Sequence, residues 1–172
     1  IGDMTFEDCE SLSTINIPSG VTSIGDNAFS ACKALRNITI PDGVTSIEYN
    51  TFGNCISLSN VSISTESKLT SIGQYSFDDC KNLESLNIPS GVTSIGQSAF
   101  YNCEKLTGIT IPSGITEIKD TVFYNCESLS SINIPSGVTS IGASAFAYCE
   151  KLTDITIPSG ITKIEESTFE GC

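Results

Sequence analysis

Apolar side chains return to the same places every 23 residues along most of the chain. In each unit a Phe is followed by a Cys, and a Leu-x-x-Ile-x-Ile pattern comes next, first as Leu12, Ile15 and Ile17. A fixed period of about 20–50 residues is typical of solenoids, because each coil buries its apolar side chains only against its neighbours. The pattern predicts a single repeat solenoid over residues 1–172, with about seven and a half coils.

Each coil is expected to contain two extended segments joined by turns. Ile15-Asn16-Ile17 alternates apolar and polar residues, which predicts a short strand with Asn16 facing outward. Stacked copies would form a parallel sheet with strands about 4.8 Å apart. A second, shorter extended segment begins at Val21. Between them, residues 17–20 fit a type I turn with Pro18 second and Gly20 fourth.

The remaining part of each coil carries all the Phe and Cys residues of the chain. Its Ala-Phe-x-x-Cys stretch predicts one short 3₁₀ or α turn. The two columns are Phe6, Phe29, Phe52, Phe77, Phe100, Phe123, Phe146 and Phe169, and Cys9, Cys32, Cys55, Cys80, Cys103, Cys126, Cys149 and Cys172. Because both residue types are apolar and recur without slippage, we predict two buried ladders along the core.

Eight cysteines in an extracellular chain would ordinarily suggest four disulfides. Equivalent cysteines in neighbouring coils would lie about 4.8 Å apart with parallel side chains, whereas Cβ atoms of a disulfide are about 3.8 Å apart. We therefore predict free thiols. A linear ladder also cannot provide converging tetrahedral ligands for zinc, and we predict no metal or cofactor site.

Charge and composition exclude several classes of function. The net charge is −12, which opposes binding to nucleic acid or to anionic lipid. The chain has no His, which removes Ser-His-Asp and Cys-His chemistry and argues against an enzyme. No apolar run approaches the roughly 18 residues of a membrane helix, and the first residues of the sequence do not show the charged-then-apolar pattern of a signal peptide. Since the chain starts within the repeat pattern, we expect it to be a fragment of a longer protein.

The repeat itself identifies a family resemblance. The sequence IPSGVTSIG occurs at residues 17–25, 88–96 and 134–142, within a longer motif Leu-x-x-Ile-x-Ile-Pro followed by Gly-Val-x-x-Ile-Gly-x-x-Ala-Phe-x-x-Cys. This motif resembles the BspA-like (treponemal-class) leucine-rich repeats in every complete coil, although the third coil has Ser64 in place of Pro. The resemblance implies a right-handed solenoid with a parallel sheet on its concave face. It also implies a secreted or cell-surface protein used in adhesion to host protein or to other cells.

Two sets of surface residues are candidates for binding a partner. The outward strand position is polar and uncharged in every coil, and a solvated sheet face is the alternative reading. The row consists of Asn16, Thr39, Ser62, Asn87, Thr110, Asn133 and Thr156. Tyr101, Tyr124 and Tyr148 are expected to cluster on one rim, as interface anchors or as ordinary half-buried residues.

The function that these observations favour is a non-enzymatic adhesion or protein-interaction module, with a protein or cell-surface ligand of host or microbial origin. The alternative is a structural segment of a longer solenoid or extracellular fibre. In either case we expect end-to-end self-association when the terminal coils are uncovered. Asn37 and Asn60 lie in glycosylation acceptor patterns, which matter only if the source secretes and glycosylates the chain.

Overall fold

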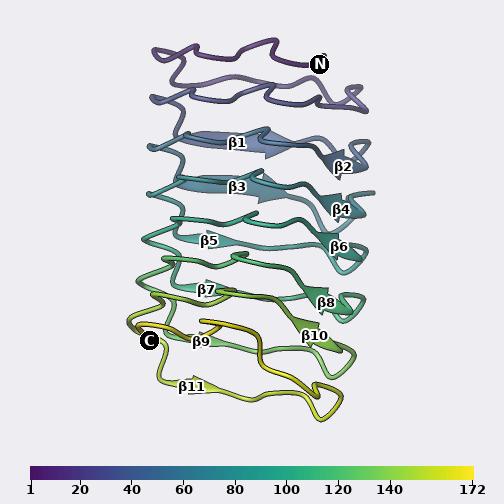
Figure 1. Cartoon of the computed structure of the whole chain (residues 1–172). Helices are drawn as coiled ribbons and strands as arrows, with labels where there is room; N and C mark the ends of the chain where they lie inside the picture. The colour runs from purple at the N-terminus through teal and green to yellow at the C-terminus, as the bar shows by residue number, and fades with distance from the viewer.

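The computed structural model describes all of residues 1–172, whose coils stack along one axis (Figure 1). Its strands are β1 (Asn37–Ile40), β2 (Ser46–Ile47), β3 (Asn60–Ile63), β4 (Ser71–Ile72), β5 (Ser85–Leu86), β6 (Ser94–Ile95), β7 (Gly108–Ile109), β8 (Glu117–Ile118), β9 (Ser131–Ile132), β10 (Ser140–Ile141) and β11 (Asp154–Ile155). All strand pairs are parallel and join neighbouring coils. No helix is long and apolar enough to cross a membrane. The predicted repeat solenoid is confirmed.

The first sheet runs along one side of the solenoid. Strands β1, β3, β5 and β7 pair in that order, and β9 pairs with β11. Asn37 lies beside Asn60, and Thr39 beside Ser62. Exposed and buried residues alternate in β1 and β3, because successive side chains of a strand point to opposite faces. The predicted strand with outward polar residues is confirmed.

The second sheet depends on a glycine that follows its strands. The N–H of Gly73 donates to the carbonyl of Ile47 at 2.7 Å, and that of Gly96 to Ile72 at 2.8 Å. A Cβ on Gly96 would lie 2.5 Å from the carbonyl carbon of Gly73, so a side chain there would prevent this approach. Where Lys119 replaces the glycine, no such bond forms, and the sheet is interrupted between β6 and β8.

The segment around each Phe is not helical, so the predicted 3₁₀ or α turn is wrong. The N–H of Cys32 does donate to Phe29 at 3.2 Å, but Ala31 between them has a φ of 56°, outside the helical region. Residues two before and two after each Phe take positive φ in every coil. Alternate N–H groups therefore point to the next coil, as when Phe29 donates to the carbonyl of Thr51 at 2.9 Å.

The proline turn is confirmed, but its register differs from the prediction by one residue. The carbonyl of Pro18 accepts a hydrogen bond from the N–H of Val21 at 3.0 Å, and the other five prolines do the same. Pro18 is therefore first in the turn, and Gly20 is third. The φ of Gly20 is not positive, so this turn does not require a left-handed residue.

The third coil places its two extra residues in the corner after β3. The carbonyl of Ser64 accepts from the N–H of Ser67 at 3.2 Å, and its hydroxyl accepts from the N–H of Glu66 at 3.0 Å. Leu69, which follows the insertion, is as fully buried as Val44 in the preceding coil. The extra residues therefore extend outward, and the core keeps its register.

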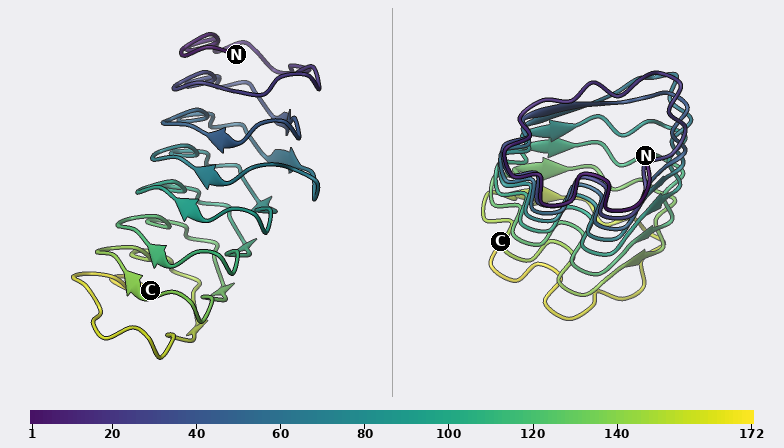
Figure 2. Two further views of the ribbon diagram at one scale, coloured as in Figure 1. Left: turned by 90° about the vertical axis from the view of Figure 1, so that its right-hand side faces the viewer. Right: turned by 90° about the horizontal axis from the view of Figure 1, so that it is seen from above.

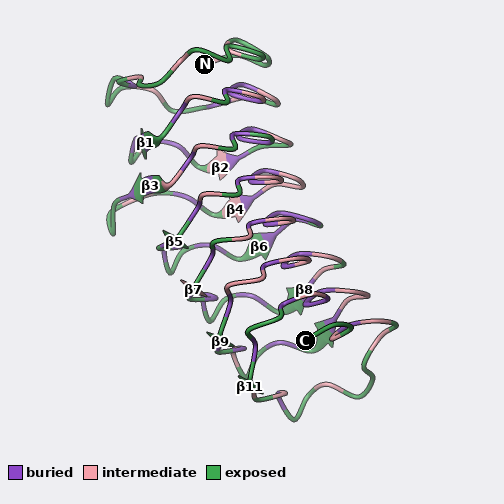
Figure 3. Cartoon of the chain, turned by 90° about the vertical axis from the view of Figure 1, so that its left-hand side faces the viewer, coloured by how far each residue is buried: buried purple, intermediate pink, exposed green.

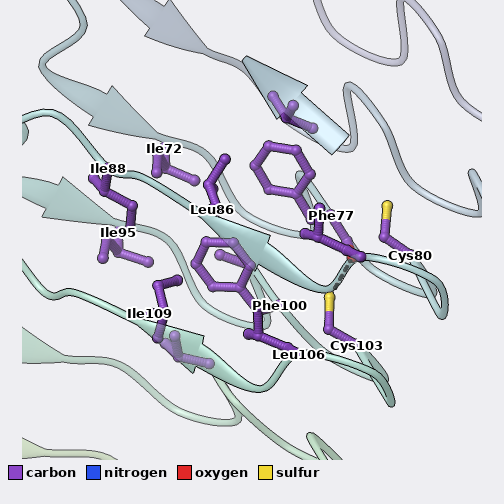
Figure 4. Packing of buried hydrophobic residues seen from close by; sticks show 14 of the residues in the cluster. Ile72, Phe77, Cys80, Leu86, Ile88, Ile95, Phe100, Cys103, Leu106 and Ile109 are labelled. Carbon is purple, nitrogen blue, oxygen red and sulfur yellow. Dashed lines mark hydrogen bonds between the residues drawn. The ribbon is translucent and has the colours of Figure 1, made fainter. Parts of the chain in front are cut away.

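The core is one cluster of 44 buried residues that runs through the stacked coils. Adjacent Phe rings stack with centroids 5.1 to 5.6 Å apart. Phe77 and Phe100, for example, are parallel to within 1° (Figure 4). The thiol of Cys103 donates to the carbonyl of Phe77 at 3.3 Å. Both predicted ladders are confirmed in the inner coils, whereas Cys9 and Cys172 at the ends are exposed because they have a neighbour on one side only.

Candidate functional site

Two faces of the solenoid lie on opposite sides of each coil (Figure 2). We call the outward side of the first sheet the first-sheet face. We call the outward side of the Phe-containing segments the turn face. These segments are residues 2–9, 25–32, 48–55, 73–80, 96–103, 119–126, 142–149 and 165–172. In the inner coils these segments contain many buried residues, as the purple parts of the ribbon show (Figure 3). Their tyrosines are half-buried or exposed.

The predicted polar row lies on the first-sheet face, and all seven of its residues are exposed. A second outward row, which the sequence analysis missed, runs beside it two residues earlier in each coil. This second row consists of Thr14, Asn37, Asn60, Ser85, Gly108, Ser131 and Asp154. Extending the strand alternation by one step toward the N-terminus would have found it.

Both rows line a shallow hollow over β5, β7, β9 and β11, with a volume of about 680 Å³. Asn87, Thr110 and Asn133 contribute from one row, and Ser131 from the other. Asp154 is the one charged residue in the lining. Amide groups and hydroxyls donate as well as accept, so the hollow offers many hydrogen bonds and little net charge.

The three tyrosines predicted to cluster do lie together, but on the turn face. The rings of Tyr101 and Tyr124 stack with centroids 4.6 Å apart and planes within 2°. Tyr148 meets Tyr124 edge-on at 5.3 Å, and its hydroxyl donates to Glu170 at 3.0 Å. The polar row and the tyrosines therefore form two separate surfaces.

Two further tyrosines on the turn face were missed by the sequence analysis. Tyr49 and Tyr75 meet edge-on with ring centroids 5.9 Å apart. They occupy other columns of the repeat than Tyr101, so a search for identical positions does not find them. The available signal was that all five tyrosines of the chain fall in the Phe-containing segments, one in each of five successive coils.

Acidic residues lie close to these tyrosines. Burial first, and then the negative charge of the neighbouring Asp79, raise the pKa of Asp78 to about 6. Oδ1 of Asp78 is buried and has no hydrogen-bond partner. Burial, followed by Tyr124 and both carboxylates, raises the pKa of Tyr101. The turn face thus combines aromatic rings with negative charge.

The buried thiols have no features of a reactive site. The Sγ atom of Cys55 donates to the carbonyl of Phe29 at 3.1 Å, and burial raises the pKa of this thiol to about 12. Burial likewise raises the pKa of Cys80 and Cys126 well above the ordinary value. Because the thiolate is the nucleophile and the metal ligand, this column serves packing.

Comparison with protein families gives a match over the whole chain. Residues 1–83 and 61–172 match the family described as BspA type leucine rich repeat region, in 6 copies. The chain belongs to the BspA-type leucine-rich repeat family. Proteins built from such repeats generally act as protein-interaction modules. No curated protein sequence matches the chain significantly.

Solved structures of bacterial leucine-rich repeat proteins share the fold of this BspA-type chain. A protein from Bacteroides ovatus is 35% identical with a TM-score of 0.89, over 94% of this chain and 41% of its own. The T. pallidum leucine-rich repeat protein is 31% identical with a TM-score of 0.82, over 90% of this chain and 71% of its own. A leucine rich cell surface protein from Faecalibacterium prausnitzii is 30% identical with a TM-score of 0.61, over 100% of this chain and 62% of its own. The chain thus spans less than half of the Bacteroides ovatus protein.

Proposed function

We propose that this BspA-type solenoid is a non-enzymatic cell-surface adhesion module that binds a protein or cell-surface ligand through its first-sheet face. The observation that carries the proposal is the hollow lined mainly by two rows of almost uncharged residues, polar and exposed except at the half-buried Gly108. Solenoids commonly use such extended faces to bind large partners.

Three further observations support this proposal. The polar rows are not needed for packing, because the core ladders lie beneath them. The lack of His removes the commonest general base, which favours binding over catalysis. The Faecalibacterium prausnitzii relative is described as a cell surface protein, which supports the same location for this chain.

The test is a binding experiment with a panel of immobilised host extracellular-matrix proteins. A variant with Asn87→Lys, Thr110→Lys and Asn133→Lys fills the hollow with long charged side chains. A matched variant carries Thr93→Lys, Thr116→Lys and Thr139→Lys, at exposed threonines that directly precede β6, β8 and β10. Both variants change the net charge by the same amount and are first checked for wild-type melting.

We expect the hollow variant to weaken binding at least about tenfold and the matched variant to change it less than about threefold. Equal loss in both variants would place the site elsewhere. Negative-stain electron microscopy of the same samples tests the fibre alternative. Filaments without binding to any panel member would favour a structural segment over an adhesion module.

A further inference from the structure

The five tyrosines form a diagonal stripe across the turn face. Relative to the Phe of its own coil, the tyrosine lies three residues before it at Tyr49 and two before it at Tyr75. It lies one residue after the Phe at Tyr101 and Tyr124, and two after it at Tyr148. Tyr49 is 45% exposed, and the other four are half-buried. We call these five residues the tyrosine stripe.

The fold does not require tyrosine at these places. Other coils carry Ser30 in the column of Tyr101, Gln97 in that of Tyr49 and Asn54 in that of Tyr148. Tyr75 and Tyr148 also take left-handed φ values of 57° and 59°, a conformation that bulky residues seldom adopt. Because these tyrosines are not needed for packing, and two of them are unfavourable for the backbone, they point to a role of their side chains at the protein surface.

The turn face also holds most of the negative charge of the protein. Its segments contain 11 of the 20 acidic residues and one of the eight basic residues, Lys119. Within the chain, only Asp79 and Glu165 of these acidic residues make ion pairs, with Lys81 and Lys163. Nine carboxylates on this face are therefore without a cationic partner.

We infer that the turn face is a second docking surface, for an extended polypeptide segment rich in arginine and lysine. The unpaired carboxylates supply charge complementarity, and tyrosines are favoured anchors at protein interfaces. This surface lies on the side opposite the first-sheet face, so the inference does not depend on the proposed adhesion site.

The geometry of the rings favours a basic peptide over other ligands. Tyr101 and Tyr124 each cover one face of the other's ring at 4.6 Å, and Tyr148 in the next coil meets Tyr124 edge-on at 5.3 Å, so this cluster leaves little open ring face. Hydroxyl oxygens accept hydrogen bonds from guanidinium and ammonium groups. A flat sugar ring or a base would need an open ring face, and a nucleic acid would be repelled by the carboxylates.

The probe is a fluorescein-labelled peptide of alternating Arg and Gly, titrated with the whole chain and followed by fluorescence anisotropy. A peptide of alternating Glu and Gly is the negative control. We expect the basic peptide to bind at about 50 mM NaCl and to weaken as salt screens the charges, and the acidic peptide not to bind. No binding of the basic peptide would overturn the inference.

Two variants test the two components of the surface. The first changes Tyr49→Gln, Tyr101→Ser and Tyr124→Ser, residues that other coils carry in these columns, and it leaves the net charge unchanged. The second changes Asp78→Ser and Asp79→Asn on the same principle. We expect each to weaken binding about tenfold while melting near the wild-type temperature.

A charge-matched control separates this site from diffuse attraction by an acidic protein. Glu84→Gln with Asp154→Asn removes two exposed carboxylates on the first-sheet side of the coil. We expect this control to change the affinity less than about twofold. An equal loss in the control, or wild-type affinity in the tyrosine variant, would overturn the inference. Neither result would bear on adhesion through the opposite face.

Discussion

The first-sheet face and the turn face belong to the same coils, yet their outer side chains differ in chemistry. The first-sheet face presents exposed Asn, Thr and Ser with a single acidic residue in its hollow. The turn face presents exposed and half-buried tyrosines among carboxylates that mostly make no ion pair. Both faces cover the same core of Phe, Cys, Leu and Ile.

This difference shows which columns of the repeat are free to vary. An inward column varies little, as in the Phe, Cys and Leu columns, because each of its members packs against the equivalent residues above and below. An outward column packs less tightly, so its residue type changes from coil to coil, as with Ser30, Tyr101 and Ala147, while the stack keeps its register. Two surfaces of different specificity can therefore be built on one repeat.

The largest expected effect comes from breaking the inward side of the turn face. Phe77→Ala removes a fully buried ring that stacks on Phe52 at 5.4 Å and on Phe100 at 5.5 Å. We expect a loss of about 3–5 kcal/mol in the free energy of unfolding, from lost burial and a cavity. Asn87→Ala on the first-sheet face is the control and should change it by less than about 0.5 kcal/mol. Urea denaturation measures both, and a loss below about 1 kcal/mol for Phe77→Ala would contradict the ladder.

A smaller loss is expected when the close approach of two coils is blocked. Gly96→Ala places a Cβ 2.5 Å from the carbonyl carbon of Gly73, so the strand must move away and give up the bond from Gly96 to Ile72. Coils with Glu48 or Lys119 at this position already lack that bond. We expect a cost of about 1–3 kcal/mol by thermal or urea unfolding. Unchanged stability would mean that the glycine is not needed for pairing.

A pH-dependent difference should distinguish the carboxylates of the two faces. The pKa of Asp78 is raised to about 6 in the folded state, so between about pH 4 and 6 the folded protein binds more protons there than the unfolded chain. Its contribution to stability is present at low pH and is lost as pH rises through 6. Relative to wild type, Asp78→Asn should gain about 1 kcal/mol between pH 4 and 7, a value reduced because the side chain is only half-buried.

Urea unfolding at several pH values measures this gain. The matched variant is Asp154→Asn, whose exposed carboxyl on the first-sheet face stays in contact with water. The same gain in both variants would show that burial of Asp78 is not its cause.

The smallest effect should be a gain in stability on the first-sheet face. Gly108 stands in β7 where the neighbouring coils have Ser85 and Ser131, and a Cβ there would meet no atom within 4 Å. Gly108→Ser should raise the unfolding free energy by about 0.5 kcal/mol, because glycine loses more backbone freedom on folding. A lower unfolding free energy, seen as a lower melting temperature, would contradict this prediction. It would mean that the serine side chain collides with a neighbouring residue.

The interior of this protein could be predicted from its sequence because its main inward columns keep one residue type, or one class of apolar residue, in successive coils. Phe77, Cys103 and Leu106 each sit in a column with one residue type, and the structure buries all three completely. The outward polar row followed from the alternation around Ile15 and Ile17 in the same way. Such columns satisfy the same packing requirement in every coil, so periodicity reveals them.

The local backbone geometry was harder to predict. The three-residue spacing of Phe29 and Cys32 suits a helical turn, and the hydrogen bond between them is present. The turn is nevertheless not helical, because Ala31 has a left-handed φ. Asn and Asp recur in that column, as at Asn54 and Asn102, and they tolerate such angles, which was an available signal. The predicted register of the turn around Pro18 was wrong by one residue, because proline can occupy more than one position of a turn.

The clustering of Tyr101, Tyr124 and Tyr148 was predicted, but the extension of the tyrosine stripe to Tyr49 and Tyr75 was not, for a different physical reason. Tyr49 and Tyr75 share no column with Tyr101, and they become neighbours of one surface only when the coils stack. Column-by-column comparison detects what each coil must conserve for packing. It does not detect a diagonal arrangement that belongs to several coils together.

The corner at Ser64 has a consequence for how such chains can diversify or be engineered. It holds two more residues than its counterparts, and Leu69 beyond it still occupies the buried position. Lengthening the corner therefore requires no compensating change in the adjoining coils. The same corner is a graft point, where a foreign epitope or recognition peptide could be carried as a loop on an otherwise unaltered scaffold.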